Sequence, residues 1–158
     1  MPKITTFLTF NDQAEAAMKL YTSVFANSKI IEQQRWGKAG PGPEGSLMTA
    51  TIDLDGTRLM LLNGGPSFGF AEGTSLFVSC DSQAEIDELW AKLSAGGEEQ
   101  PCGWLKDRFG VSWQIIPKVL GKLIGDSDPA KAGRAVNAML KMKKLDIATL
   151  ERAHAGQT

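Results

Sequence analysis

Few side chains in this sequence are suited to catalysis. Its 158 residues include one histidine, His154, and two cysteines, Cys80 and Cys102. The cysteines are far apart and form no C-x-x-C motif, so they predict neither a zinc site nor a redox pair. We expect both to be buried free thiols, because cysteine is among the most buried residue types. His154 lies near the C-terminal end and is expected to be solvated rather than catalytic.

The most informative polar side chain is Gln114, which lies in residues 103–117, GWLKDRFGVSWQIIP. Phe109 and Gly110 predict a turn between two strands. After this turn, apolar and other residues alternate with the period of a strand that has two different faces, and Pro117 ends the pattern. The alternating sets are Val111, Trp113 and Ile115 on one face and Ser112, Gln114 and Ile116 on the other. We expect the first face to be core.

The sequence also contains an internal repeat. Residues 54–62 show the same turn and alternating strand, centred on Gly56. An offset of 69, the separation of Phe7 and Leu76, also aligns a helix cap and an apolar stripe: Asp12 with Asp81, Ala17 with Ile86, Leu20 with Leu89, Tyr21 with Trp90 and Val24 with Leu93. At the turn the offset falls to 54, because only the first half has the loop at residues 37–45. A repeat of this size predicts two units of the same topology.

Each unit is expected to run strand, helix and then three strands. The first strand spans residues 4–10, and Asn11 and Asp12 are expected to cap the first helix. Asp81 and Ser82 are expected to cap the second. The loop at residues 37–45 has Gly or Pro at six of nine positions and could act as a lid. Three helices should follow Pro117: a short one at 119–124, one beginning at Asp128 and Pro129, and one capped by Asp146.

Composition excludes several classes of partner. The length suits a single domain, residues 1–158, comprising module one at 1–66, module two at 74–117 and a helical tail at 118–158. No apolar run approaches the roughly 20 residues of a membrane helix. No secretory signal is evident, so we expect a cytoplasmic protein. The net charge is -1 with both signs interspersed, which makes nucleic acid an improbable partner.

Two β-α-β-β-β units followed by helices resemble the vicinal-oxygen-chelate superfamily, which includes glyoxalase I, extradiol dioxygenases and bleomycin- and fosfomycin-resistance proteins. Residues 103–117 and residues 139–147, MLKMKKLDI, resemble more closely its PhnB-like branch, labelled 3-demethylubiquinone-9 3-methyltransferase. The resemblance covers nearly the whole chain. It implies an α+β fold in which two modules form a cupped mixed sheet, followed by C-terminal helices.

The resemblance also raises the question of a metal. Enzymes of this superfamily typically hold a divalent ion with His, Glu or Gln side chains from the first and last strands of each unit. Here those positions are Thr6, Met60, Ser75 and Gln114. Two hydroxyls, a thioether and an amide do not replace anionic or imidazole donors. We therefore expect no catalytic metal and no cofactor, and we assign no catalytic residue.

The methyltransferase label has a separate test in the sequence. A conventional S-adenosylmethionine enzyme has a glycine-rich turn between a strand and a helix. Gly64 and Gly65 lead instead into Pro66, and residues 37–45 join two strands. The motif that this activity would require is therefore missing.

The resemblance implies a cup with apolar walls and a few polar groups, which is typical of a small-molecule pocket. Its expected lining is Thr6, Leu8, Thr49, Thr51, Met60, Ser75, Phe77, Ser112 and Gln114, with Trp36 and Trp104 near the rim. Any one of these residues could instead only fill a core. The leading hypothesis is a small-molecule-binding protein without a catalytic metal. Its alternatives are an enzyme with an unrecognised cofactor or a metal recruited by Gln114, and a methyltransferase acting on a quinone-like phenol.

The tail predicts a homodimer. Its longer helix carries an apolar stripe of Ala132, Ala135, Val136, Met139 and Leu140, which must be covered because a lone amphipathic helix of this length is marginal in water. A partner subunit is the expected cover. Packing within the same chain is the alternative.

Overall fold

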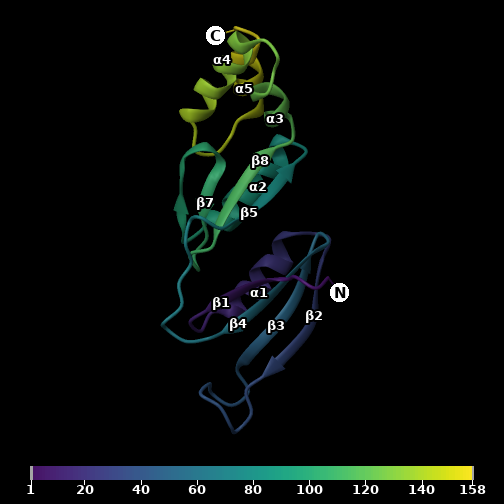
Figure 1. Ribbon diagram of the computed structural model, residues 1–158, viewed down its shortest axis with the longest axis vertical. Coiled ribbons are helices and arrows are strands. Elements are labelled where there is room, and N and C mark those ends of the chain that lie inside the picture. The colour runs from purple at the N-terminus through teal and green to yellow at the C-terminus, as the bar shows by residue number, and fades with distance from the viewer. Residues whose placement is uncertain (1, 158) are drawn as a thin grey trace. The chain divides into compact units, whose positions relative to one another are not determined.

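The computed structural model describes residues 2–157 and divides the chain into two compact units. Unit 1 ends at Gly69, and unit 2 begins at Phe70. Each unit contains one four-stranded mixed sheet (Figure 1). The predicted α+β class is confirmed, with the strands divided between two sheets.

Unit 1 has one helix packed on its sheet. Its elements are β1 (Thr6–Phe10), α1 (Ala14–Val24), β2 (Ser28–Arg35), β3 (Leu47–Leu54) and β4 (Thr57–Asn63). The strand order is β1-β4-β3-β2, with β1 parallel to β4 and the other pairs antiparallel. The predicted sequence of elements is therefore present.

Unit 2 repeats this topology. Its elements are β5 (Ser75–Cys80), α2 (Gln83–Ser94), β6 (Glu98–Glu99), the 3-10 helix η1 (Pro101–Gly103), β7 (Trp104–Lys106) and β8 (Ser112–Pro117). The order is β5-β8-β7-β6, again with the first strand parallel to the last. The predicted turn lies between β7 and β8, where Gly110 has φ 91° and its N–H donates to the carbonyl oxygen of Asp107 at 3.0 Å. The duplication is thus confirmed at the level of strand order.

Three of the predicted helix caps are correct. The side chains of Ser82, Asp128 and Asp146 each accept a backbone N–H in the first turn of α2, α4 and α5. The cap predicted at Asn11 and Asp12 is wrong. Gln13 occupies that position without a side-chain bond.

A side chain distant in sequence caps α1 instead. The N–H of Ala14 donates to Oδ1 of Asn63 at 2.8 Å, and Nδ2 of Asn63 donates to the carbonyl oxygen of Leu47 at 3.0 Å. Asn63 therefore ties the start of the helix to the end of β4 and the start of β3.

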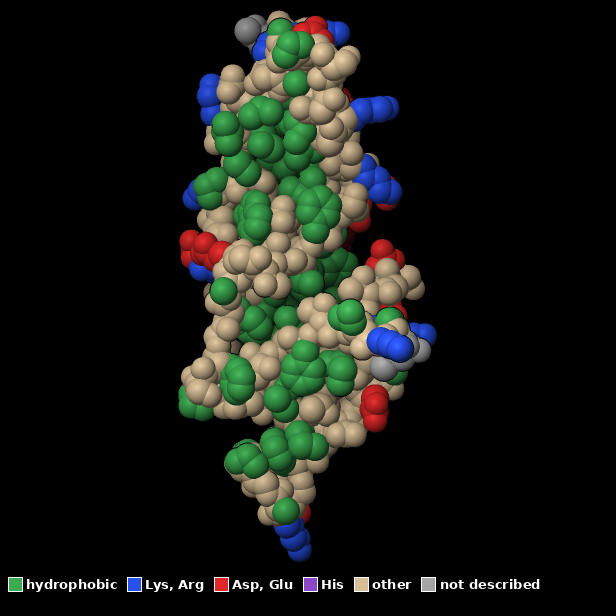
Figure 2. All heavy atoms as spheres, in the orientation of Figure 1, with side chains coloured by type: hydrophobic (Ala, Val, Ile, Leu, Met, Phe, Trp, Pro, Cys, Tyr) green, Lys and Arg blue, Asp and Glu red, His purple; other side chains and the backbone are tan. Residues whose placement is uncertain are grey.

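The C-terminal helices complete the core of unit 2. They are α3 (Val119–Ile124), α4 (Pro129–Leu140) and α5 (Ile147–His154). Their buried side chains form one cluster with the end of β8: Ile116, Leu120, Leu123, Ala135, Leu145 and Leu150. In α4 only Ala135 is fully buried, and Leu140 is 58% exposed. Hydrophobic side chains are visible on the surface over these helices (Figure 2).

Two motifs that are separate in the sequence meet in this region. The N–H groups of Cys102 and Gly103, just before β7, donate to the carbonyl oxygens of Met142 and Lys143, each at 2.8 Å. An added Cβ at Gly103 would lie 3.1 Å from Cδ1 of Leu145. The chain between α4 and α5 therefore packs directly against the start of residues 103–117.

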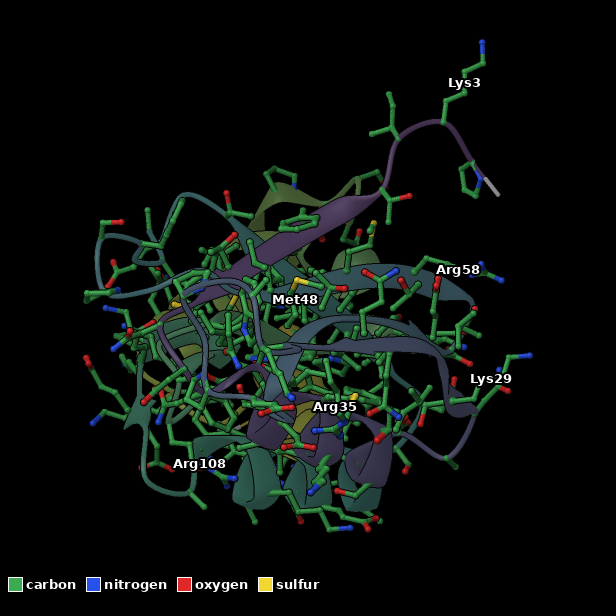
Figure 3. The ribbon with its side chains drawn as sticks, turned by 90° about the horizontal axis from the view of Figure 1, so that it is seen from below. Lys3, Lys29, Arg35, Met48, Arg58 and Arg108 are labelled. Atoms are coloured by element: carbon green, nitrogen blue, oxygen red, sulfur yellow. The ribbon has the colours of Figure 1, made fainter. Side chains whose placement is uncertain are left out.

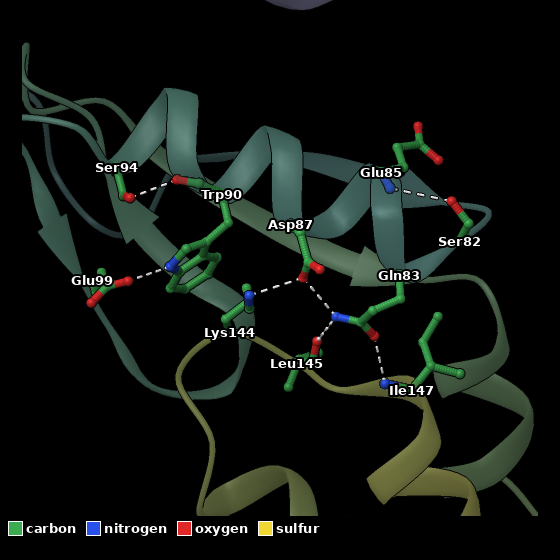
Figure 4. A network of polar contacts seen from close by, with 10 residues as sticks. All are labelled: Ser82, Gln83, Glu85, Asp87, Trp90, Ser94, Glu99, Lys144, Leu145 and Ile147. Atoms are coloured by element: carbon green, nitrogen blue, oxygen red, sulfur yellow. Dashed lines mark hydrogen bonds and ion pairs between the residues drawn. The ribbon is translucent and has the colours of Figure 1, made fainter.

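Gln83 in the first turn of α2 also holds the segment between α4 and α5 (Figure 4). Its Nε2 donates to the carbonyl oxygen of Leu145 at 3.0 Å, and its Oε1 accepts from the N–H of Ile147 at 2.8 Å. Nε2 also donates to Asp87, whose carboxylate pairs with Lys144 at 2.9 Å. These contacts fix the start of α5 on α2. Within residues 2–157, no helix is long and apolar enough to span a membrane.

Candidate functional site

The face of the unit 2 sheet that points away from α2 carries the predicted polar residues. On the α2 side, Trp113 is 2% exposed and Ile115 is fully buried. Side chains alternate between faces, so Ser112 and Gln114 lie on the other side of β8, which we call the open face. Strand pairing sets Ser75 and Lys106 beside Ser112, and Phe77 and Trp104 beside Gln114. Ser75, Phe77, Trp104, Ser112 and Gln114 therefore share one face.

An amide and two hydroxyls form the polar centre of this open face. Nε2 of Gln114 lies 2.9 Å from Oγ of Ser75, to which it donates. Ser112 is 1% exposed, and its Oγ has no hydrogen-bond partner in the described part of the chain. A buried hydroxyl without a partner costs about 1–3 kcal/mol. No side chain or backbone group within residues 2–157 offsets this cost.

Aromatic rings flank this centre, and the cation beside it, Lys106, is paired. Phe77 is 60% exposed, while Trp104 is half-buried. Nζ of Lys106 lies 2.5 Å from Oε1 of Glu72. This contact lowers the pKa of Glu72 and raises the pKa of Lys106. Lys106 therefore belongs to an ion pair and is not a free cation.

The sheet of unit 1 has its own open face. Pairing places Met60 beside Phe7 and Thr51, while Thr49 lies one row further, beside Leu62. The predicted residues Thr49, Thr51 and Met60 therefore share a face, with Thr51 buried.

The register predicted for β1 is wrong. Leu8 is buried and pairs with fully buried Leu61, and Thr6 pairs with Leu59 on the same helix-covered side. Phe7 and Thr9 occupy the open face instead. Thr6 is consequently not a ligand contact on that face.

Trp36, predicted at a rim, is packed by its own loop. A Cβ added at Gly42 would lie 2.1 Å from Cδ1 of Trp36, so only glycine allows this approach of the loop to the indole. The N–H of Trp36 donates to Ser46 O at 2.9 Å, and the N–H of Gly45 donates to Trp36 O at 2.8 Å. The loop therefore folds over the indole of Trp36, and two backbone hydrogen bonds of Trp36 join its ends.

The donor set does not fit a catalytic divalent metal. Residues 2–157 contain no group of three or more His, Cys, Asp or Glu side chains placed to hold one. Of the four superfamily ligand positions, Thr6 faces the helix side, and the other three supply a thioether, a hydroxyl and an amide. Catalytic sites for divalent ions are built mainly from carboxylate or imidazole donors, which these positions do not supply.

The histidine and the two cysteines are not among the residues of the open face of unit 2. His154 was expected to be solvated, but its side chain is 20% exposed and its Nε2 lies 2.8 Å from Oδ2 of Asp126. Cys80 is a buried free thiol as predicted, and burial, with smaller effects of Glu85 and Asp81, raises its pKa to about 12. Cys102 is only half-buried.

Sequence reasoning missed Asp107, the carboxylate that organises the turn between β7 and β8. Asp107 is 2% exposed, and Oδ1 accepts from the N–H groups of Phe109 at 2.9 Å and Val111 at 3.1 Å. Oδ2 accepts from Nε1 of Trp113 at 3.0 Å. The repeat contained the signal, because the offset of 54 aligns Asp107 with Asp53, whose Oδ1 accepts from Gly56 N at 2.8 Å.

The duplicated strand order places the chain in the vicinal-oxygen-chelate class of folds. The fosfomycin resistance protein FosX from Listeria monocytogenes, solved with Mn(II) and sulfate ion, shares this fold with TM-score 0.50 and 18% identity over 72% of this chain and 90% of that chain. A Pseudomonas aeruginosa protein shares it with TM-score 0.63 and 23% identity over 75% and 98% of the two chains.

Within that class, the chain belongs to the 3-demethylubiquinone-9 3-methyltransferase family, whose model matches residues 2–116. It is similar to a solved Bacillus cereus PhnB protein described as a putative 3-demethylubiquinone-9 3-methyltransferase, with 38% identity and TM-score 0.69 over 73% of this chain and 99% of that chain. No protein with a curated description matches.

Proposed function

We propose that the chain binds an organic small molecule on the open face of the unit 2 sheet, without a catalytic metal. The observation that supports this proposal is the unpartnered, buried hydroxyl of Ser112 beside the hydrogen-bonded pair of Gln114 and Ser75. Aromatic side chains next to a few oriented polar groups are typical of small-molecule sites. Phe77 and Trp104 supply the apolar part.

Gln114 and Ser75 act by binding and orientation in this proposal. The hydrogen bond from Nε2 to Ser75 holds the amide in one orientation, which leaves Oε1 to accept from a ligand. The neighbouring rings bury the apolar part of the ligand and exclude water from this contact. We assign no bond-making step to these residues, because the face has no carboxylate or imidazole beside Gln114 to move a proton.

The first test is the composition of the purified protein. Mass spectrometry of the extracted protein should find a bound organic molecule, and elemental analysis should find far less than one equivalent of divalent metal per chain. Phe77→Ser should lose the molecule, because its ring contacts the ligand in this proposal. Phe68→Ser is the matched control, because Phe68 is similarly exposed, 54% against 60%, but lies in unit 1. A stoichiometric metal would overturn the proposal, as would equal retention by both variants.

Methyl transfer is the second candidate, and the family description favours it. It requires saturable binding of S-adenosylmethionine, which isothermal titration calorimetry measures directly. We expect no saturable heat, because no glycine-rich turn joins a strand to a helix in this chain. Micromolar binding, together with methylation of a phenolic acceptor, would establish methyl transfer in place of binding alone.

A further inference from the structure

The groups left unsatisfied on the open face of unit 2 define the polarity of what it can bind. Gln114 uses Nε2 to donate to Ser75, and no donor of the described chain reaches its Oε1. One row away, the hydroxyl of Ser112 is buried and unpartnered. Residues two apart on a strand are separated by roughly 7 Å. The face therefore offers a carbonyl acceptor and a hydroxyl within the length of one small molecule.

Charge on this face argues against an ionised ligand. Among the residues of β5, β7 and β8 in the two rows, only Lys106 is ionisable, and it is paired with Glu72, which also accepts from Gln100 at 3.4 Å. Glu98 on the edge strand β6 lies opposite Lys106. An anion placed here would lose hydration without gaining a free cation, and it would face the Gln114 carbonyl oxygen. A cation would have to compete with the Lys106 ammonium for Glu72 and Glu98, the two carboxylates next to it. The ligand that fits is uncharged.

Aromatic side chains lie on both sides of the acceptor. Phe77 on β5 and Trp104 on β7 each pair with Gln114 on β8, at a strand spacing of about 4.8 Å. Rings in this arrangement favour a flat apolar ligand through stacking and edge contacts. A hydroxyl on such a ring can donate to Gln114 Oε1.

We propose that this face selects uncharged aromatic alcohols, with the ligand hydroxyl donating to Gln114 and the Ser112 hydroxyl binding a second polar group. The proposal rests on the proposed function and adds the chemical class of the ligand. Ser75 is a positioning residue in it, because it sets the orientation of the amide without contacting the ligand.

Three probe molecules of similar shape test the proposed chemical class of the ligand. 4-Ethylphenol, 4-ethylanisole and 4-ethylbenzoate share a ring and an ethyl group but differ in the donor and the charge. Amide NMR of the full chain at pH 7 should show shifts in residues 75–80 and 112–117 on adding 4-ethylphenol. We expect the ether and the benzoate to bind at least tenfold more weakly, because each would cover Gln114 Oε1 without donating a hydrogen bond to it.

Single variants test the assigned residues. Gln114→Leu should remove the preference for the phenol over the ether, while leaving weak binding of both. Ser112→Ala should weaken binding of 4-hydroxybenzyl alcohol, which carries a second hydroxyl, more than binding of 4-ethylphenol. Ser79→Ala is the control, because Ser79 is exposed on the same face of β5 in the next row, and it should change neither affinity.

The outcomes separate the two proposals. Equal binding of all three probes to this face, or a preference for the benzoate, would overturn the ligand class and leave small-molecule binding in place. If neither the probes nor the molecule extracted from the purified protein shifts residues 75–80 or 112–117, both proposals fail. A preference for the phenol that survives Gln114→Leu would remove Gln114 from its assigned role.

Discussion

The same aspartate occurs in both repeats, but its surroundings differ. Asp107 accepts three N–H groups and is 2% exposed, whereas Asp53 accepts one backbone N–H, pairs with Arg58 at 3.8 Å and is partly exposed. One carboxylate therefore holds a turn and a buried indole, while its counterpart only closes a surface hairpin.

This difference predicts unequal effects of one substitution. Asp107→Asn replaces an acceptor oxygen with an NH2 group that faces N–H donors, so we expect unfolding free energy to fall by roughly 1–3 kcal/mol. Asp53→Asn is the built-in control and should cost less than about 1 kcal/mol, because it can keep its single bond to Gly56 N. Urea denaturation followed by fluorescence measures both. Equal losses would show that burial of Asp107 is not the cause.

The two thiols should react at very different rates. Burial raises the pKa of Cys80 to about 12, so at pH 8 almost none of it is thiolate, the form that reacts. Cys102 is half-buried and should be alkylated by iodoacetamide in the native protein. Peptide mass spectrometry should find Cys80 modified only after unfolding. Comparable native labelling of both residues would contradict the burial of Cys80.

At the scale of elements, one amide side chain, that of Gln83, holds the start of α5 on α2. Gln83 bonds to the backbone on both sides of Asp146, just before and at the start of α5, whereas Lys144 contributes only an exposed ion pair with Asp87 (Figure 4). Exposed ion pairs contribute little to stability, about 0–1 kcal/mol. The hydrogen bonds of Gln83 satisfy backbone groups that otherwise lack partners.

Gln83→Ala should therefore loosen the segment between α4 and α5. We expect trypsin to cleave after Lys141 or Lys143 severalfold faster in this variant than in the native chain, because local opening exposes these bonds. Arg35→Ala, a variant in unit 1 that removes the 2.5 Å contact with Glu15, should leave this cleavage rate unchanged. An unchanged rate in Gln83→Ala would show that the other contacts of the segment suffice.

The elements that sequence reasoning placed correctly have local signals. Ser82, Asp128 and Asp146 cap helices through residues two or three positions away, and the strands of both repeats follow local alternation. The cap of α1 comes from Asn63, 49 residues later, which no local pattern contains.

The prediction of which sheet face Thr6 occupies was wrong for a related reason. The run from Thr6 to Phe10 places threonine and apolar residues on both faces, so alternation alone does not distinguish its two sides. Only the parallel pairing of Thr6 with Leu59 and the burial of Leu8 assign them. In β8, by contrast, Trp113 and Ile115 form a clear apolar face, and Gln114 was assigned correctly to the other.

The whole chain is still expected to be a homodimer. The tail packs within unit 2 through Ala135, Leu145 and Leu150, yet Leu140 in α4 remains 58% exposed. Light scattering at micromolar concentration should give twice the chain mass. Leu140→Glu should weaken association at least about tenfold, because it removes a leucine worth roughly 1.5–3 kcal/mol when buried.

The control for this experiment is Ile4→Glu. Ile4 is 90% exposed and belongs to unit 1 rather than to the apolar stripe of α4. A native chain that is monomeric at this concentration contradicts the dimer, and a dimer unaffected by Leu140→Glu excludes α4 as the contact. Truncation after Pro117 is a poor test, because it would expose Ile116 by removing the helices that cover it.

In unit 1 the charged side chains of Lys3, Lys29 and Arg58 extend away from the ribbon (Figure 3). Arg108, next to the buried Asp107, lies over the ring of Phe109, with its guanidinium carbon 4.7 Å from the ring centroid. The turn thus carries a buried, hydrogen-bonded carboxylate on its inner side and a cation stacked on a ring on its outer side.

The burial of Leu145 and Leu150 has a consequence for synthesis of the chain. Unit 1 has all its strands once Asn63 has been added, so it can begin to fold while the rest is being translated. Unit 2 must wait for residues that come more than one helix after its last strand, because the cluster that buries Ile116 and Leu120 is complete only when Leu150 has left the ribosome. We therefore expect a nascent chain that stalls inside α4 to present a finished first repeat and an unfinished second one, which is the form that chaperones and proteases would recognise.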